Sequence, residues 1–208
     1  NQGNKTFFCR VGLLMRVDHL FPEPLYFSKL ERVLTKEELK IFNEHEKKTQ
    51  KNAGNRRTND NYVLEHKALK NLKKDLNQKI INYFNEVICC TNTTIPYITQ
   101  SWINYTKENQ FHHRHAHPNS YISGVFYIDA DKKVDKISFF RSGYSTFLPF
   151  VTQFNIFNSA TASYSIQGGD VLLFPSFLHH GVNTKKGTNI RTSLSFNVFF
   201  KGAFGNKK

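Results

Sequence analysis

The chain has 208 residues, of which 39% are apolar and 14% aromatic, so it can bury a core and is not a disordered chain. Its 29 Lys and Arg residues exceed its 16 Asp and Glu residues, and the net charge of +13 allows a nucleic-acid partner, although lysines on helices are more often a solvated surface. No run approaches the ~20 apolar residues of a membrane span, and the first residues lack the order of a secretory signal, so we expect a soluble, cytoplasmic protein without a membrane partner.

The first part of the chain predicts extended segments followed by a helix. The stretch from Thr6 to Phe27 mixes apolar residues with two prolines, which suggests extended chain broken by a turn. Thr35 is followed three residues later by Glu38, and this capping box predicts a helix that runs to about Gln50.

A second helix is predicted after a polar segment. The residues from Lys51 to Asn61 are mainly polar and are expected to form an exposed loop. From Leu64 onward, apolar residues recur at steps of three and four, which predicts a helix with one buried face. That face carries Leu69, Leu72, Leu76, Ile80, Phe84, Val87 and Ile88. It could bind a partner helix, but packing against a sheet is the stronger expectation.

After Cys90 the pattern changes to short β-type runs separated by glycine-containing turns. The runs are Ile95 to Thr106, Tyr121 to Asp129, Lys136 to Phe140, Asp170 to Phe174 and Ile190 to Phe200. Two helices followed by many short strands indicate an α+β fold, mainly β, whose sheet curls into a sandwich or barrel. We expect one domain over residues 1–208, with helical support over about 35–90 and a β core over about 95–200.

Histidines are concentrated in two short segments, FHHRHAHPNS and FPSFLHHGV, which hold six of the nine in the chain. Clustered imidazoles repel one another when charged, so a metal ion that keeps them neutral gives them a reason to be together. On an extended strand His115 and His117 point to the same side and can bind one ion. His180 lies just past the apolar strand DVLLFP and can supply a third ligand, because the ends of the two strands can be neighbours in a curled sheet. The alternative is that these three are core histidines with satisfied hydrogen bonds. The remaining histidines are interpreted as two surface residues and one packing residue, namely His112, His113 and His179.

The last predicted strand, IRTSLSFNV, has one apolar face and one polar face. The polar face carries Arg191, Ser193, Ser195 and Asn197, and it could simply meet water. However, Arg191 follows His180 by eleven residues, and a guanidinium can hold a carboxylate through two parallel hydrogen bonds. A metal centre beside an arginine indicates a site for a small anionic cosubstrate.

The combination of His115, His117, SGVFYI, GDVLLFPSFLHHGV and RTSLSFN resembles the 2-oxoglutarate- and iron(II)-dependent oxygenases, particularly the small relatives of prolyl 4-hydroxylases found in phages and bacteria. The opening LFPEPLYFSKL is similar to their N-terminal strand, so the resemblance covers most of the chain. It implies a double-stranded β-helix, which is a jelly-roll barrel with helices packed on one side. It also implies iron(II) held by a His-x-carboxylate pair and a distal His, with 2-oxoglutarate and dioxygen as cosubstrates. A phage-encoded member would act in the host cytoplasm.

Carried onto this chain, the resemblance makes His115 the first iron ligand. It makes His180, rather than its neighbour, the distal ligand, because the family places a small residue and a Val after that His, as Gly181 and Val182 do here. Arg191 would hold the distal carboxylate of 2-oxoglutarate.

The resemblance also assigns further cosubstrate contacts. Ser193 matches the hydroxyl of the family's Arg-x-Ser pattern, and Tyr127 and Ser123 resemble the groups that reach the same carboxylate in the prolyl hydroxylase branch. Asn104 is placed like an Asn that contacts the cosubstrate in the nucleic-acid demethylase branch. Tyr105 is its rival, because only one of the two neighbours on a strand can face inward.

His117 is the departure from the family pattern, which usually has Asp or Glu at this position. A neutral imidazole supplies no negative charge to balance iron(II), although three-histidine sites suit iron, copper, nickel and zinc. If His117 is a bystander, Asp129 or Asp170 would have to approach the ion, but Asp170 is expected to complete the turn at Gly168 and Gly169.

We therefore expect a dioxygenase that hydroxylates a C–H bond while 2-oxoglutarate is converted to succinate. A peptide or protein substrate is preferred, because the branch most resembled is the prolyl hydroxylase one, while nucleobases and small metabolites are the alternatives. The segments Lys51 to Asn61 and Arg141 to Phe157 are candidates for the mouth of the site or for packing loops.

Two rival functions remain open at this point. The first is a cupin-like jelly-roll metalloenzyme with three histidines and no use of 2-oxoglutarate. The second is a basic, non-catalytic jelly-roll protein that binds nucleic acid or a structural partner. The second is disfavoured because it leaves the His-x-His pair, the distal His and the Arg without a role.

Overall fold

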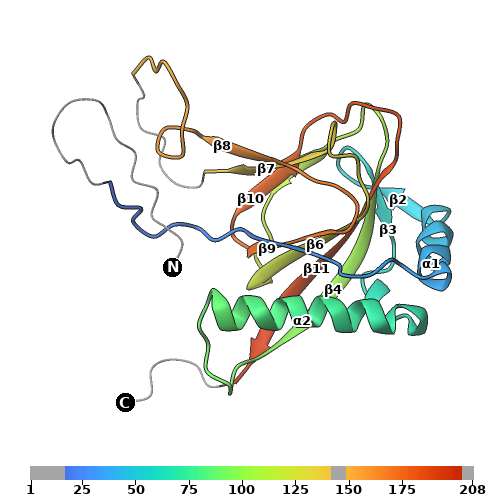
Figure 1. The fold of residues 1–208 in the computed structure, drawn as a ribbon. Helices are drawn as coiled ribbons and strands as arrows, with labels where there is room; N and C mark the ends of the chain where they lie inside the picture. Colours follow the sequence, from blue (N-terminus) through green and yellow to red (C-terminus); the bar gives the residue numbers. More distant parts are fainter. Residues whose placement is uncertain (1–16, 142–148, 203–208) are drawn as a thin grey trace.

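The computed structural model describes residues 17–141 and 149–202, in which two antiparallel sheets face each other and helices cover one side (Figure 1). The large sheet has the spatial order β1 (Tyr26–Lys29), β9 (Asp170–Pro175), β6 (Ile122–Asp129), β11 (Arg191–Lys201), β4 (Ile95–Thr106), β3 (Arg56–Thr58) and β2 (Thr49–Lys51). The small sheet has the order β5 (His112–His115), β10 (His179–Val182), β7 (Lys136–Phe140) and β8 (Thr161–Ser165). This arrangement confirms the predicted α+β, mainly β jelly-roll.

The large sheet has a core on each of its two faces. On its outer side it packs against α2 (Lys70–Glu86), whose buried residues Leu72, Leu76, Ile80 and Phe84 join one hydrophobic cluster with the sheet. On its inner side, Leu172 and Phe174 pack with Ile137 and Phe139 of the small sheet in a second cluster. Side chains alternate between the two faces of the sheet along β11. Leu194, Phe196 and Val198 pack on the side of the helices, so the polar residues between them face the small sheet.

The predicted helices exist, but they are shorter than expected. Helix α1 (Lys36–Glu46) begins with the predicted capping box, in which Thr35 accepts from the Glu38 backbone and the Glu38 carboxylate accepts from the Thr35 backbone. It ends before Gln50, because residues 49–51 form β2 instead. Before α2, the residues after Leu64 form short 3-10 turns, Val63–Glu65 and Lys67–Leu69, and Val87 lies exposed beyond the helix.

The prediction of an exposed loop from Lys51 to Asn61 is wrong. The segment contains the end of β2 and all of β3, which pairs with β4 and extends the large sheet. Thr58 and Asn55 are buried, and Thr58 accepts a hydrogen bond from the Ile103 backbone. Polar side chains can occupy this strand because they satisfy each other at the sheet edge instead of filling a core.

The N-terminal prediction is confirmed only for its end, where β1 pairs with β9, while residues 6–16 lie outside the described residues. All five strands predicted after Cys90 are present within one or two residues of their expected bounds. The strands β8 and β10 were not predicted, and the extended strand expected for His115 and His117 is β5, which ends at His115. No helix among the described residues is both long and apolar enough to cross a membrane.

One partly buried ion-pair group ties the chain before α1 to both helices. Arg32 donates to both oxygens of Glu38, at 2.7 and 2.8 Å, and to Asp75 on α2 at 2.7 Å. Glu38 is only 1% exposed, so burial alone would raise its pKa, but the bonds from Arg32 and the Thr35 backbone hold that pKa below its ordinary value. A buried carboxylate that is paired in this way stabilises the fold mainly because the pair is complete.

We predict that Glu38→Gln lowers the free energy of unfolding by about 2 kcal/mol, because it removes one partner of a largely buried pair and weakens the capping box. Glu44→Gln is the matched control on the same helix, since Glu44 forms only an exposed pair with Lys40 at 3.8 Å, worth less than about 0.5 kcal/mol. Urea unfolding at neutral pH measures both values. The pKa of Glu38 is lowered in the folded protein, so the difference between wild type and Glu38→Gln should shrink as the pH falls below 4.5. Equal losses in the two variants would contradict this role of Glu38.

Candidate active site

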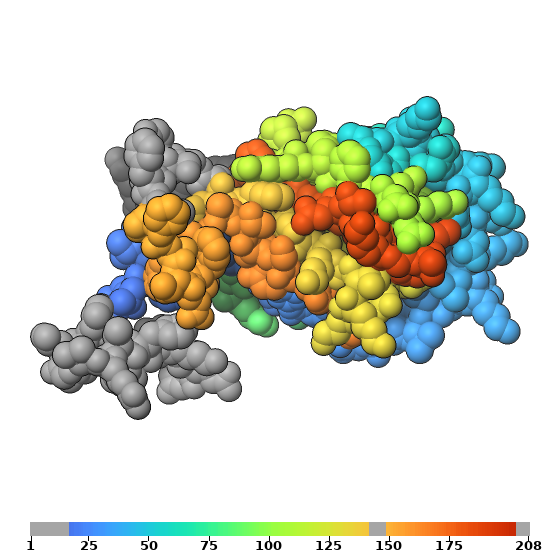
Figure 2. Space-filling view, turned by 90° about the horizontal axis from the view of Figure 1, so that it is seen from above, coloured from blue at the N-terminus to red at the C-terminus, as the bar shows by residue number. Residues whose placement is uncertain are grey.

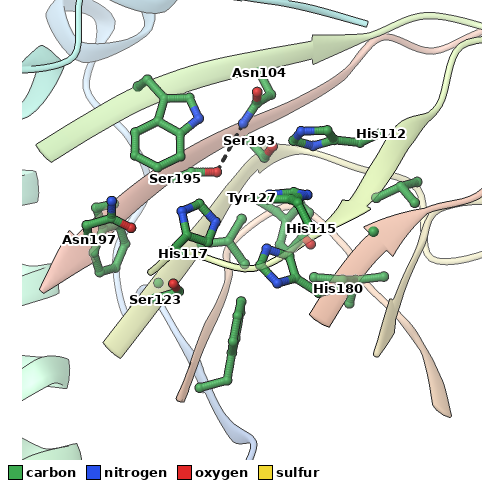
Figure 3. A pocket seen from close by; sticks show the side chains of 18 of the residues that line it. Asn104, His112, His115, His117, Ser123, Tyr127, His180, Ser193, Ser195 and Asn197 are labelled. Atoms are coloured by element: carbon green, nitrogen blue, oxygen red, sulfur yellow. Dashed lines mark hydrogen bonds between the residues drawn. The ribbon is translucent and has the colours of Figure 1, made fainter. Parts of the chain in front are cut away.

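The three predicted histidine ligands meet at one end of the space between the sheets (Figure 3). His115 ends β5 and is paired directly with His180 of the neighbouring strand β10. His117 follows two residues later, and its backbone N–H donates to the Ser176 carbonyl at 2.9 Å, which fixes this segment against the turn between β9 and β10. The ring centroids are 4.4 Å apart for His115 and His180, 5.0 Å for His115 and His117, and 5.2 Å for His117 and His180.

Backbone carbonyls orient two of these rings. His115 Nδ1 lies 2.8 Å from the His113 carbonyl oxygen, and His180 Nδ1 lies 2.9 Å from the Leu178 carbonyl oxygen. A carbonyl only accepts, so Nδ1 carries the proton in both rings and Nε2 keeps its lone pair. This is the arrangement that orients metal-binding histidines in proteins.

Burial keeps all three rings neutral. Together with the neighbouring imidazoles, burial lowers the pKa of His180 to about 3 and that of His117 to about 4. Burial also lowers the pKa of His115. Because a neutral imidazole is the form that binds a metal ion, the three rings are ready to act as ligands across the ordinary pH range.

The histidines form one wall of a cavity whose opposite wall is the polar face of β11. Arg191 is 3% exposed and donates to Thr106 Oγ1 at 3.1 Å, the only side-chain hydrogen bond of Arg191 among the described residues. Strand register aligns Asn104, Ser193 and Tyr127 in one row across β4, β11 and β6, next to Arg191. No carboxylate is among the described residues that line this cavity.

A buried carboxylate lies behind Arg191. Asp135, in the turn between β6 and β7, has Oδ1 at 3.5 Å from Lys185 Nζ and 3.9 Å from Arg191, and its Oδ2 accepts from Asn189 at 3.1 Å. Lys185 is also buried and donates to Asn189 and to two backbone carbonyls. In Figure 2 the segments around residues 107–111 (light green), 130–136 (yellow) and 183–190 (red) lie side by side over this group. Asp135 therefore balances one of two buried cations.

The structure separates the remaining sequence candidates. Asn104 lines the cavity and donates to Ser195 Oγ at 3.0 Å, whereas Tyr105 faces the helices and donates to the Phe42 carbonyl at 2.6 Å. Ser193 and Tyr127 lie beside Arg191. Ser123 also lines the cavity, but it pairs with Asn197, which is roughly 20 Å along β11 from Arg191, and it hydrogen-bonds to Ser176.

The two alternative carboxylates are not in the cavity. Asp129 is exposed at the end of β6, and Asp170 accepts from the Gln167 backbone at 2.9 Å, which completes the glycine turn as expected. His113 is exposed and His179 is half-buried on the other side of β10, in agreement with their interpretation. The interpretation of His112 as a surface residue is wrong, because its half-buried ring lines the cavity.

Sequence reasoning missed several residues of the site. Trp102, the only tryptophan of the chain, lines the cavity with its ring 5.6 Å from that of His117. Its position was readable from the alternation along β4, which puts it on the same face as Asn104. Asp135 gave no such signal, because its burial arises from a turn that packs against a distant loop.

The cavity opens into a groove of about 320 Å³ that is lined mainly by polar side chains. The lining includes Asn52, Arg57, Asn61, Gln100 and Asn119, together with Trp102 and the histidines of β5. Arg57 lies over the Trp102 ring, and the segment predicted as a mouth thus borders the groove. The other predicted mouth, Arg141 to Phe157, borders a separate apolar pocket where it is described, and residues 142–148 lie outside the described residues.

Residues 100–197 match the protein family described as "Putative 2OG-Fe(II) oxygenase". The matched segment contains all three converging histidines and Arg191. The match covers 98 of the 208 residues and agrees with the resemblance to the superfamily of 2-oxoglutarate- and iron(II)-dependent oxygenases. Members of this superfamily use iron(II), 2-oxoglutarate and dioxygen. No curated protein sequence matches the chain.

Solved structures of oxygenases share the fold at low sequence identity. A Trichoplax adhaerens prolyl hydroxylase in complex with a hypoxia inducible factor peptide fragment is 12% identical, with a TM-score of 0.58 over 84% of this chain and 83% of that chain. HygX from Streptomyces hygroscopicus, with nickel, 2-oxoglutarate and hygromycin B bound, is 13% identical, with a TM-score of 0.53 over 83% and 82%. A Pseudomonas putida prolyl-4-hydroxylase is 10% identical, with a TM-score of 0.54 over 88% and 94%.

We predict that Asp135→Asn destabilises the protein by about 3 kcal/mol, because it leaves Lys185 and Arg191 buried without a counter-charge. Asp131→Asn is the matched control in the same turn, since Asp131 is exposed and its carboxylate accepts only a local hydrogen bond from the Lys133 backbone. It should cost less than about 1 kcal/mol. Chemical unfolding of both variants measures the difference, and an Asp135→Asn variant as stable as the control would show that the two cations need no partner.

Proposed function

We propose that this oxygenase hydroxylates a C–H bond of its substrate at an iron(II) ion held by His115, His117 and His180, with Arg191 binding 2-oxoglutarate. One observation carries the proposal. Three imidazoles from separate positions in the chain converge at one end of a cavity, and a buried guanidinium with unused donors lies at its inner wall. A metal ion and a dicarboxylate together match these two groups.

The donor set fits iron(II), although it departs from the usual one. Three neutral nitrogen donors suit iron(II), and three protein ligands leave coordination positions for a cosubstrate. His117 is favoured as the third ligand, because neither Asp129 nor Asp170 lines the cavity. Iron(II), when bound, supplies the redox chemistry that couples oxidative decarboxylation of 2-oxoglutarate to oxidation of the substrate.

The inner wall supports the binding of a carboxylate. Arg191 can offer two parallel N–H groups, and Thr106 holds one edge of its guanidinium. Burial raises the pKa of Tyr127 well above its ordinary value, although Arg191 opposes this, so its hydroxyl keeps its proton and can donate. We assign the distal carboxylate of 2-oxoglutarate to Arg191 and Tyr127, with Ser193 beside them.

The middle of the cavity offers further polar contacts to the cosubstrate. Asn104 donates to Ser195, while its own Oδ1 is buried without a hydrogen-bond partner among the described residues. Val125, Ile137 and Phe174 form an apolar part of the lining. These side chains limit the access of water to the ion, which favours coupling of cosubstrate turnover to substrate oxidation.

A peptide or protein is the substrate class that we favour. The groove outside the cavity offers primary amides from Asn52, Asn61, Gln100 and Asn119, and amides can both donate to and accept from a peptide backbone. The shared fold of the two prolyl hydroxylases, one of which binds a peptide, supports the same choice.

Oxygen-dependent conversion of 2-oxoglutarate to succinate tests the proposed function. His180→Ala should abolish this conversion and also the quenching of Trp102 fluorescence by cobalt(II), because Trp102 lies next to the His117 ring. Arg191→Ala should weaken the binding of 2-oxoglutarate by roughly 30- to 200-fold, which corresponds to about 2 to 3 kcal/mol for a bidentate charged contact.

Arg141→Ala is the control for this experiment, since Arg141 is exposed and bonds only backbone carbonyls of its own loop. It should leave 2-oxoglutarate binding unchanged. A tenfold or smaller loss in Arg191→Ala would count against the assigned role of Arg191. Metal binding without any affinity for 2-oxoglutarate would favour the cupin-like alternative.

A further inference from the structure

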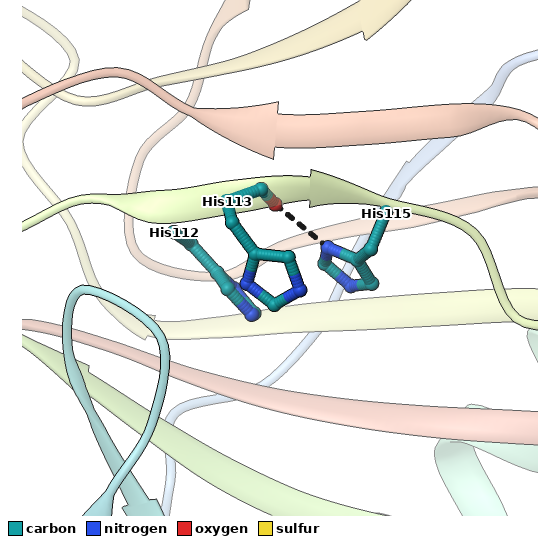
Figure 4. A group of neighbouring side chains, drawn as sticks. All are labelled: His112, His113 and His115. Atoms are coloured by element: carbon teal, nitrogen blue, oxygen red, sulfur yellow. Dashed lines mark hydrogen bonds between the residues drawn. The ribbon is translucent and has the colours of Figure 1, made fainter.

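Strand β5 carries three histidines within four residues, and an irregularity brings their rings together. In a regular strand, neighbours such as His112 and His113 point to opposite faces. Here His180 pairs with His115 and Val182 pairs with His112, so two steps on β10 match three steps on β5. The extra residue is a β-bulge, a feature that re-aims side chains and is common beside active sites. Figure 4 shows all three rings on the same side of the strand.

The three rings are close enough to share one ion. Their centroids are 5.3 Å apart for His112 and His113, 4.8 Å for His113 and His115, and 4.5 Å for His112 and His115. One nitrogen from each ring can be chosen so that all three lie within 4.8 Å of one another. Gly181 makes this close approach possible, because a Cβ there would lie 3.0 Å from the His112 carbonyl oxygen and 3.1 Å from that of His113.

The surroundings of this group favour an imidazole-binding ion. All three rings line the open groove, His113 is exposed, and no carboxylate is among the described residues of that lining. Nitrogen donors without carboxylates favour zinc(II), copper(II) or nickel(II) over magnesium and calcium. His112 Nε2 lies 3.3 Å from the Asn52 amide nitrogen, which also donates to Asn55 at 2.9 Å. The Asn52 amide donates to this Nε2, so a metal ion on either ring nitrogen of the neutral His112 replaces this contact.

We propose that His112, His113 and His115 form a second metal site, the outer site, which takes a zinc-type ion and excludes an ion from the inner site of His115, His117 and His180. The exclusion follows from His115, because its Nδ1 is held by the His113 carbonyl and only Nε2 is free. A single lone pair binds one ion at a time. The outer site stands on the geometry alone, while its inhibitory effect on the oxygenase rests on the proposed function.

The exclusion has a measurable size. An ion at ten times its dissociation constant for the outer site raises the apparent dissociation constant of the inner site about elevenfold, as expected for two mutually exclusive ligands. Zinc(II) can also enter the inner site directly, so inhibition by zinc alone does not distinguish the two. Variants that lack one site and keep the other distinguish binding at the outer site from binding at the inner site.

Zinc(II) binding to the full chain, measured by equilibrium dialysis, tests the outer site. His117→Ala removes one inner ligand and keeps the outer group, so it should still bind one zinc ion per chain. Adding His113→Ala to it should weaken that binding at least tenfold, because one of three ligands is lost. His113 is exposed, so its replacement should leave the fold intact, which thermal unfolding checks. His117→Ala combined with His179→Ala is the matched control, since His179 belongs to neither group, and it should bind like His117→Ala.

Two results would overturn the inference. Equal zinc affinity of His117→Ala with and without His113→Ala would show that no outer site exists. Two zinc ions bound to each wild-type chain would show that the two sites are independent. Failure of the proposed function gives a different pattern, in which the outer site binds zinc as expected but neither wild type nor His113→Ala converts 2-oxoglutarate.

Discussion

The antiparallel pairing of β5 with β10 is the constraint on which the site depends. It puts His115 directly opposite His180, and the hydrogen bond from His117 to Ser176 continues the same contact beyond the end of β5. Backbone carbonyls then set the two paired rings so that their Nε2 atoms are free. The large sheet contributes the rest, because β11 carries its polar face into the cavity while its apolar face packs against α2. His115 and His180 lie on the small sheet and Arg191 lies on the large sheet, so the site depends on the packing of the two sheets against each other.

The charges of the site explain why neutral ligands and a buried arginine occur together. Arg191 and Lys185 contribute two positive charges and Asp135 one negative charge, so this buried group carries a net charge of +1. With three neutral histidines, an iron(II) ion keeps its full charge of +2. A dianion such as 2-oxoglutarate can balance most of this sum, with one carboxylate at each end of the cavity. If His117 takes the place of the usual carboxylate ligand, as proposed, the site depends more strongly on an anionic cosubstrate for its charge balance.

Sequence alone predicted the features that arise from local patterns. The capping box at Thr35, the apolar stripe of α2 and the alternation of β11 each act within a few residues, and each was found. The convergence of His115, His117 and His180 was also predicted, with the help of the family resemblance. The β2–β3 hairpin and the inward ring of His112 were missed, because a polar edge strand gives no apolar signal and a bulge depends on the register with another strand. Asp135 was missed because a distant loop buries it.

The most direct test of this account is X-ray absorption spectroscopy at the iron edge of the chain loaded with iron(II) in the absence of oxygen. The account predicts scattering from three imidazole rings per iron, which falls to two in His117→Ala. A spectrum with only two imidazoles in the wild-type chain, and no change in His117→Ala, would contradict the three-histidine centre.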